Sequence, residues 1–284
     1  QQIINTGLIE LKEDFKIYWN EHPIGKLITG KDYLNPKFEL IVDDILENDQ
    51  KKILNEFIEK WLNNKIDNIL KSLIDLKYLK EKNSSIKALA YQLYENNGVI
   101  KRENAKDFIK KLAQEERKIL RNLGVKFGRY HIFLYKLFKP NAVSLRIALW
   151  KNFHQKYFDL KPPTFGLNFL KEKKEYSKDF MLLCGFEKFD NFFVRIDILE
   201  RLFIKIIDLK NEKEIKLIPE MLNLLGCSKE DFLKLIKKMN YYSYEKNKET
   251  YFKYSPMRKN TKKIPSKIIN KENPFNVLKN INFK

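Results

Sequence analysis

The order of hydrophobic patterns between residues 195 and 254 constrains the fold more than any other feature of this chain. Apolar residues at helical spacing predict three helices, over residues 195–209, 218–225 and 232–239. Gly226 marks a tight turn before the third helix, and Ser228 is its predicted N-cap. Strand formers then flank a polar loop at 245–249, which is typical of a β-hairpin. Three helices followed by a hairpin indicate a winged-helix-like domain over residues 191–254.

The residues before this domain are predicted to be mostly helical. Apolar residues recur at spacings of three and four from Ile53 to Leu76, which predicts a long helix over about 38–79. Further helices are predicted over 105–123 and 141–158, while 125–134 is ambiguous between helix and strand. Strand formers on both sides of a turn at 20–23 predict a hairpin near the N-terminus. No internal repeat is visible in the sequence.

We therefore expect a mainly α fold in five parts. They are a β-hairpin segment at 1–34, a helical domain at 35–160, a linker at 161–190, the winged-helix-like domain at 191–254 and a disordered basic tail at 255–284. The linker is placed at Pro162-Pro163 and the charged stretch 171–178, because both interrupt the apolar pattern.

The charge of the chain is concentrated in two segments. Lys and Arg number 56 against 37 Asp and Glu, a formal net charge of +19. Residues 117–158 hold ten of the basic residues and no acid, and residues 241–284 hold eleven basic residues and three acids. A solvated surface normally mixes both signs, so an acid-free basic stretch indicates a polyanionic partner. RNA or DNA fits this pattern, as a single strand or a duplex end.

Aromatic residues interleave with the cations of 117–158, and this combination is the strongest functional signal. Cations neutralise phosphates, and exposed rings stack on unpaired bases. Gly124 and Gly128 would allow backbone N–H groups to approach a phosphate. The alternative is that the rings belong to the core and the cations form a solvated face. The residues we select in this segment are Arg121, Lys126, Phe127, Arg129, Tyr130, Lys136, Lys139, Arg146 and Lys151.

The third helix of the winged-helix-like domain supplies a second set of cations. In a nucleic-acid-binding winged helix this helix lies against the groove and its phosphates. The alternative is that the domain docks another protein. The candidate residues are Lys229, Lys234, Lys237 and Lys238.

Catalytic and metal-binding patterns are weak. Residues 25–32 match a phosphate-binding loop except at Asp32, where Ser or Thr would be needed to hold Mg²⁺. A hairpin strand followed by a turn explains the same residues better. The three histidines and two cysteines show no ligand spacing, so we expect no metal and no cofactor in this chain.

Two further features bear on location. The two cysteines, Cys184 and Cys227, form no disulfide framework, which indicates a reducing compartment and a cytoplasmic protein. No apolar run approaches eighteen residues, so we expect no membrane-spanning helix and no membrane partner.

The segment Leu123-Gly124-Val125-Lys126-Phe127-Gly128-Arg129 resembles a region downstream of the motor in bacterial relatives of the mitochondrial degradosome RNA helicase, a superfamily-two family. Supporting similarities occur at residues 19–30, 134–140, 145–150, 194–202, 224–228 and 274–278. That family hydrolyses ATP to move along and unwind RNA or DNA. Its ATPase motifs lie in two RecA-like domains that would precede Gln1, so ATP and Mg²⁺ are implied for those domains and no catalytic residue is implied here.

The resemblance implies a non-catalytic accessory region that guides a strand beyond the motor. Its partners would be nucleic acid, the upstream motor domains and a protein docked at Phe275 and Leu278 in the tail. Two alternatives stay open, a free-standing winged-helix nucleic-acid-binding protein and an RNA-associated scaffold. Whether the chain belongs to an enzyme is uncertain from the residues alone.

Overall fold

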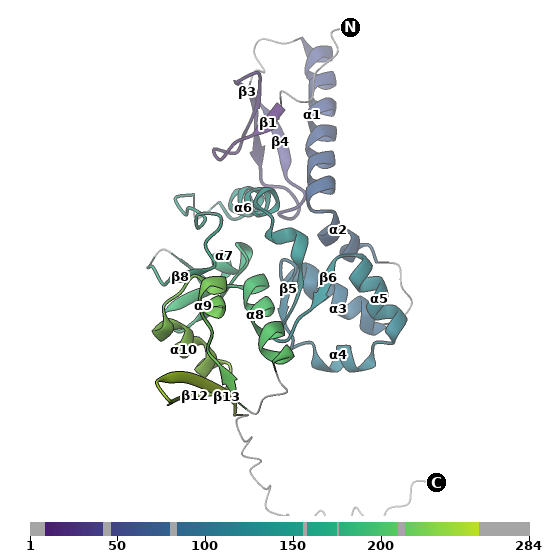
Figure 1. The fold of residues 1–284 in the computed structure, drawn as a ribbon. Helices are drawn as coiled ribbons and strands as arrows, with labels where there is room; N and C mark the ends of the chain where they lie inside the picture. Colours follow the sequence, from purple (N-terminus) through teal and green to yellow (C-terminus); the bar gives the residue numbers. More distant parts are fainter. Residues whose placement is uncertain are drawn as a thin grey trace, which may run out of the picture.

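The computed structural model describes residues 9–41, 47–79, 84–155, 158–174, 176–209 and 214–255 (Figure 1). The fold is mixed α/β, with 48% helix, 23% strand and four small antiparallel sheets. Our prediction of a mainly α fold is therefore wrong. Most of the strands have only two to four residues, which is too short for alternation to be visible in the sequence.

A four-stranded sheet begins the described chain. Its strands follow one another in space as in sequence, as β1 (Ile9–Leu11), β2 (Lys16–Trp19), β3 (His22–Ile28) and β4 (Lys37–Leu40). The predicted hairpin corresponds to β2 and β3, where Trp19 pairs with His22. The predicted helix over 38–79 is shorter than expected, because its first residues form β4. In β4 half-buried and exposed residues alternate, which is the period of a strand.

Two helices follow this sheet. The long helix α1 (Asn48–Ile69) buries Ile58, Leu62 and Ile66 on one face, which matches the apolar spacing that predicted it. The short helix α2 (Lys71–Lys77) continues after a break at Leu70. Figure 1 shows α1 beside the N-terminal sheet at one end of the molecule.

Residues 84–134 form a compact unit that we call module A. Its elements are α3 (Ser84–Glu95), β5 (Val99–Lys101), α4 (Lys106–Lys111), α5 (Gln114–Asn122), β6 (Val125–Phe127) and β7 (His131–Leu134). The three strands form a sheet in the order β5-β7-β6. The predicted single helix over 105–123 is divided at Leu112, which has an extended backbone and is buried.

Residues 196–254, which we call module C, have the same order of elements. They are α8 (Ile196–Asp208), β11 (Ile215–Lys216), α9 (Pro219–Leu225), α10 (Lys229–Lys238), β12 (Tyr241–Lys246) and β13 (Glu249–Tyr254). The sheet order is β11-β13-β12, again with the last strand in the centre. Module C occupies the residues of the predicted winged-helix-like domain. Module A has the same helix–strand–helix–helix–hairpin order, which the sequence patterns do not predict.

Residues 140–195, module B, give a shortened version of this topology. After the 3₁₀ turn η3 (Tyr135–Phe138) come α6 (Pro140–His154), β8 (Phe169–Lys171), α7 (Lys178–Leu183), β9 (Phe186–Phe189) and β10 (Phe192–Arg195). The sheet order β8-β10-β9 matches the other two modules, but no helix lies between β8 and α7 within the described residues. Most of the predicted linker at 161–190 is thus part of module B.

Module B has its own hydrophobic core, which is why it is not a linker. Phe180 and Leu183 of α7 are fully buried against Ile147 of α6 and Phe193 of β10. A six-residue helix and a three-residue strand are too short to give a periodic signal. Pro162-Pro163 and the charged residues that follow therefore lie within a folded unit.

One backbone position is repeated in all three modules. Between the last helix and the hairpin stands a residue with positive φ, namely Gly124 (95°), Gly185 (90°) or Asn240 (64°). Each donates its N–H to the carbonyl three residues earlier, at 2.9, 2.9 and 3.2 Å. A left-handed residue at this point turns the chain from helix into strand, and Gly and Asn tolerate it best. The three modules therefore share a left-handed backbone conformation at this position, although the residue type differs.

The modules are joined without long connections. Strand β10 ends at Arg195 and α8 begins at Ile196. Module A shares its core with α1 and the N-terminal sheet, whereas the core of module C is a separate cluster. Figure 1 shows modules A and C as two lobes on either side of the lower half of the molecule.

A candidate nucleic-acid interface where three modules meet

The turn between β6 and β7 of module A is held by a carboxylate from module C. Glu200 of α8 is buried and accepts backbone N–H groups from Arg129, Tyr130 (2.9 Å) and His131 (2.7 Å). Its Oε1 also lies 3.1 Å from Nδ1 of His131. A buried carboxylate is stable only where such donors surround it. Glu200 therefore fastens module A to module C.

His131 extends this joint into module B. Its Nε2 lies 3.4 Å from Glu187 of β9, and Glu187 forms an ion pair of 2.8 Å with Lys101 of β5. Burial lowers the pKa of His131, but the hydrogen bonds and charges of Glu187 and Glu200 outweigh burial and raise it. Burial raises the pKa of Glu187, yet its bonds to His131 and Lys101 lower it overall. His131, between the carboxylates of Glu187 and Glu200, thus links all three modules.

The two glycines predicted to expose N–H groups to phosphate have internal partners instead. The N–H of Gly124 donates to Arg121 O (2.9 Å), and that of Gly128 donates to His131 O (2.8 Å). A Cβ on Gly128 would collide with the carboxylate of Glu200. The run of N–H groups after Gly128 does bind an anion, but the anion is a side chain of the same protein.

A groove lies beside this joint. It has a volume of about 710 Å³. Its walls are the β5–α4 loop and β6–β7 turn of module A, the β9–β10 turn of module B, and the ends of α10 and β13 in module C. The rings of Tyr130, Phe189 and Tyr254 also line it. Its cationic residues are Lys101, Arg102, Lys106, Arg129, Lys188 and Lys238.

Most of these cations already have partners. Lys238 pairs with Asp190 at 2.8 Å, Lys188 pairs with Glu172, and Arg102 donates to Gly128 O at 2.7 Å. In the part of the chain that the structure describes, Lys106 and Arg129 form no ion pair. Both are exposed. Six cations and three carboxylates (Glu103, Glu187 and Asp190) line the groove, so its net charge is positive. Lys106 and Arg129 are the two cations of the groove that are available to bind a ligand, and we call them its available charges.

Only three of the predicted nucleic-acid-binding residues line this groove. They are Arg129, Tyr130 and Lys238. Arg121, Lys126, Lys136 and Lys139 are exposed elsewhere on module A and the segment after it. Arg121 lies over the ring of Phe127 at 5.7 Å, and Lys126 over that of Tyr135 at 5.2 Å.

Two of the predicted phosphate contacts are buried. Arg146 has no exposed surface, and its guanidinium donates to Asn97 O (3.1 Å) and Leu137 O (2.7 Å). Burial lowers its pKa to about 10. Lys151 is 9% exposed and its ammonium donates to the carbonyls of Phe158 and Leu160. Both cations tie loops to α6, so neither reaches a bound strand.

The rings of the basic segment belong mostly to the core. Phe127 packs against the core of module A, and Tyr130 packs against that of module C, edge-on to Phe203 at 4.6 Å. Helix α10 shows a similar limit, because three of its four lysines form ion pairs. Lys229 pairs with Glu245 and Lys234 with Asp231, whereas Lys237 forms no ion pair among the described residues.

No protein-family model, curated protein or solved structure matches this chain.

Several cations of the groove were missed by the sequence reasoning. Lys101, Arg102 and Lys106 precede the acid-free segment, and Lys188 lies in the predicted linker. These residues stand in stretches of mixed charge, so no local signal identifies them. Only the meeting of three modules brings them together.

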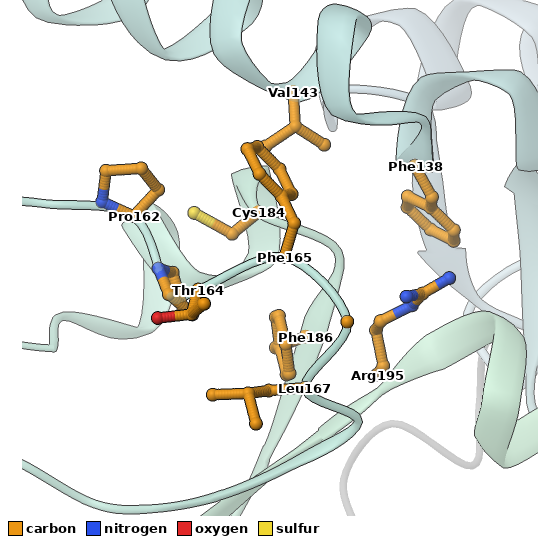
Figure 2. Close-up of a pocket in the computed structure, with 11 residues that line it drawn as sticks. Phe138, Val143, Pro162, Thr164, Phe165, Leu167, Cys184, Phe186 and Arg195 are labelled. Atoms are coloured by element: carbon orange, nitrogen blue, oxygen red, sulfur yellow. The ribbon is translucent and has the colours of Figure 1, made fainter.

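The second cavity near the joint is too small for a ligand. It offers about 20 Å³, which is space for roughly one water molecule. Figure 2 shows Phe138, Val143, Cys184 and Phe186 around it, with the guanidinium of Arg195 near Phe138. Arg195 is paired with Asp197 at 2.6 and 2.8 Å. This cavity is a packing gap between the segment 162–167 and the elements α6, η3 and β9.

Residues 25–28 lie in β3, and Asp32 accepts from Leu34 N (3.0 Å) and pairs with Lys77 (3.3 Å), so this loop does not fit a nucleotide. Gly226 ends α9 with a φ of +68°. Phe275 and Leu278 lie outside the described residues. Within the described residues, no group of His, Cys, Asp or Glu side chains is arranged to hold a metal ion. None of the described helices has the length and apolar character of a membrane-spanning segment.

Proposed function

We propose that this chain is a non-catalytic nucleic-acid-binding region that holds a single strand in the groove between modules A, B and C. The observation that carries the proposal is the groove itself, about 710 Å³ in volume and lined by six cations and three aromatic rings. Lys and Arg side chains neutralise phosphates, so a groove with an excess of cations favours the backbone of a strand. A buried charged joint beneath it fixes the positions of the walls.

Within this proposal, the available charges do the binding. Lys106 and Arg129 meet the phosphates directly, because neither has a carboxylate partner among the described residues. The paired cations Lys101 and Lys238 shape the walls. The contacts are with the backbone of the strand, so we expect little sequence preference and strong salt dependence.

The resemblance to the accessory region of a superfamily-two helicase supplies a context for this groove. We propose that the chain follows the motor domains of such a helicase and guides the strand that leaves them. The coding sequence upstream of Gln1 tests this point. RecA-like motor motifs there support it, and an initiator codon directly before Gln1 contradicts it.

The binding proposal is tested by removing the two available charges together. We expect Lys106→Ala/Arg129→Ala to weaken binding of a fluorescent single-stranded RNA, measured by anisotropy over a range of salt concentrations. The slope of log affinity against log salt should fall by about 1.4, since each lost contact with a single strand removes about 0.7.

The matched control replaces two exposed lysines of α1, as Lys52→Ala/Lys60→Ala. Figure 1 shows α1 at the opposite end of the molecule from α10 and β13. Both double variants lose two charges, so a general effect of net charge appears equally in both. Equal affinity and slope in the two variants would refute the groove as the binding site.

A further inference from the structure

The outer face of the module C sheet carries a row of tyrosines that the groove does not use. In β12 and β13 the residues Tyr241, Thr250 and Phe252 point into the module and are buried. Because side chains alternate along a strand, their neighbours Tyr242 and Tyr251 point outward. This face is therefore a separate surface.

The three outward rings of Tyr242, Tyr244 and Tyr251 lie next to one another on this face. Tyr244 is paired with Tyr251 across the hairpin, and their ring centroids are 6.1 Å apart at an interplanar angle of 22°. Tyr242 lies 6.1 Å from Tyr244 at 18°. Tyr242 is 58% exposed and the other two are half-buried. The result is a row of nearly parallel rings open to solvent at one end.

Lysines accompany the rings. Lys253, paired with Tyr242 across the strands, lies over the ring of Tyr244 at 5.8 Å, and Lys246 lies over that of Tyr251 at 6.0 Å. Lys216 of β11 stands beside Tyr251 and pairs with Glu249 at 2.5 Å. Lys253 has no ion pair within the residues described by the structure. Lys246 pairs with Glu214 at 3.5 Å, so Lys253 supplies the uncompensated charge beside these aromatic rings.

We propose that this tyrosine face, formed by Tyr242, Tyr244, Tyr251 and the adjacent Lys253, binds the unpaired bases of a single strand of nucleic acid by stacking. This inference deepens the proposed function and rests on it. Aromatic rings with nearby cations complement the flat faces of bases and the charge of their backbone.

The spacing of the rings favours a single strand over a duplex. Their centroids are 6.1 Å apart, whereas stacked bases in a helix rise by about 3.4 Å. Bases that contact two successive rings must therefore separate from each other. A duplex cannot do so without losing its own stacking and pairing, so its bases are not available to this face.

The groove and the tyrosine face recognise different parts of the ligand. The groove holds phosphates, while the tyrosine face holds bases. An oligonucleotide without bases separates the two, because it keeps the phosphates and loses the stacking partners. We therefore compare a labelled 12-nucleotide thymidine oligonucleotide with an abasic one of the same length, both titrated by anisotropy with the full chain.

The wild-type chain should bind the thymidine oligonucleotide about tenfold more tightly than the abasic one. In Tyr242→Leu/Tyr251→Leu this preference should disappear, since leucine keeps the apolar bulk but cannot stack in the same way. Tyr242→Phe/Tyr251→Phe should retain it. Tyr91→Leu on α3, also an exposed tyrosine at 62%, is the matched control and should leave it unchanged.

The single variant Tyr242→Leu covers the case in which the half-buried Tyr251 is needed for folding. It should reduce the preference by several-fold, with circular dichroism confirming an intact fold. A wild-type chain that binds both oligonucleotides equally, or a leucine variant that keeps the preference, overturns the proposal. Lys106→Ala/Arg129→Ala should weaken binding of both oligonucleotides alike, so failure of the groove and failure of the tyrosine face give different results.

Discussion

Modules A and C share one topology, yet their hairpins have opposite roles. In module A the turn between β6 and β7 is short, and Glu200 of module C binds three of its backbone N–H groups. In module C, β12 and β13 are six residues each, and their turn at Asn247 and Lys248 is exposed. One hairpin forms an internal joint, and the other presents a surface.

This difference shows why a basic sequence does not by itself locate a binding surface. The acid-free segment around module A's hairpin binds a carboxylate of its own protein through backbone N–H groups, and two of its cations are buried in α6. The hairpin of module C has mixed charge and an outward row of tyrosines, of which Tyr242 is exposed and Tyr244 and Tyr251 are half-buried. Position in the assembly of modules, rather than local composition, decides which hairpin is available to a ligand.

The largest effect is expected from removing the carboxylate of the joint. Glu200→Ala should lower the free energy of unfolding by about 3–5 kcal/mol, because it leaves His131 and three backbone N–H groups buried without their acceptor. Urea unfolding measures this change. Asp208→Ala, at an exposed position of the same helix, should stay within about 0.5 kcal/mol. Similar values for both variants would show that the joint is not what holds modules A and C together.

A smaller effect should follow from crowding the joint. Gly128→Ala places a Cβ against Glu200 and 2.8 Å from His131 O, which should cost about 1–3 kcal/mol by forcing the carboxylate away. Gly226→Ala is the matched variant, because nothing lies within 4 Å of its added Cβ and only its φ of +68° is unfavourable. Its expected cost is about 1 kcal/mol.

The two glycine variants also differ in their remote effect. Only Gly128→Ala should speed hydrogen exchange at the amides of Tyr130 and His131, which donate to Glu200. Unchanged exchange at these amides would mean that Glu200 adapts without leaving its site.

The smallest effect concerns the proton on His131. Its raised pKa means that its contribution to stability is complete below about pH 6.5, the ordinary value, and is lost as the pH rises through the raised value. The lowered pKa of Glu187 contributes above about pH 4.5 and is lost as the pH falls through the lowered value. The joint should therefore be strongest between these limits.

Urea unfolding at about pH 6 and about pH 8.5 measures this dependence. The wild-type chain should be less stable at the higher pH, and His131→Gln should show a smaller difference between the two. An equal pH dependence in both proteins would place the titrating group elsewhere.

The hairpins of the fold could be predicted from sequence where their strands were long. Tyr241–Lys246 and Glu249–Tyr254 alternate clearly and flank a polar tip. Strands β5 to β7 have three or four residues, so β5 gives no strand pattern within the predicted helical domain, and the pattern at 125–134, which forms β6 and β7, is ambiguous between helix and strand. The common position of Gly124, Gly185 and Asn240 is invisible in the sequence because two residue types serve one backbone conformation.

The candidate site was predictable only in part. Arg129 follows a glycine in a basic turn, a local pattern that selected it, and it lines the groove. Arg146 occurs in an equally basic stretch, but the i, i+3 and i, i+4 apolar neighbours on α6 lie almost all around it and bury it. No sequence pattern identifies Lys106, because it becomes part of the groove only where modules B and C lie against module A. Sequence patterns describe one element at a time, and this groove is made by several.

The direct passage from β10 into α8 has a consequence for which length changes the chain can accept. Glu200 lies in the second turn of a helix that begins immediately after Arg195. One residue inserted at this boundary would rotate every side chain of α8 by about 100° relative to module B. The carboxylate would then face away from the turn that it binds. We expect this boundary to resist single insertions and deletions, while the exposed turn of β12 and β13 accepts them.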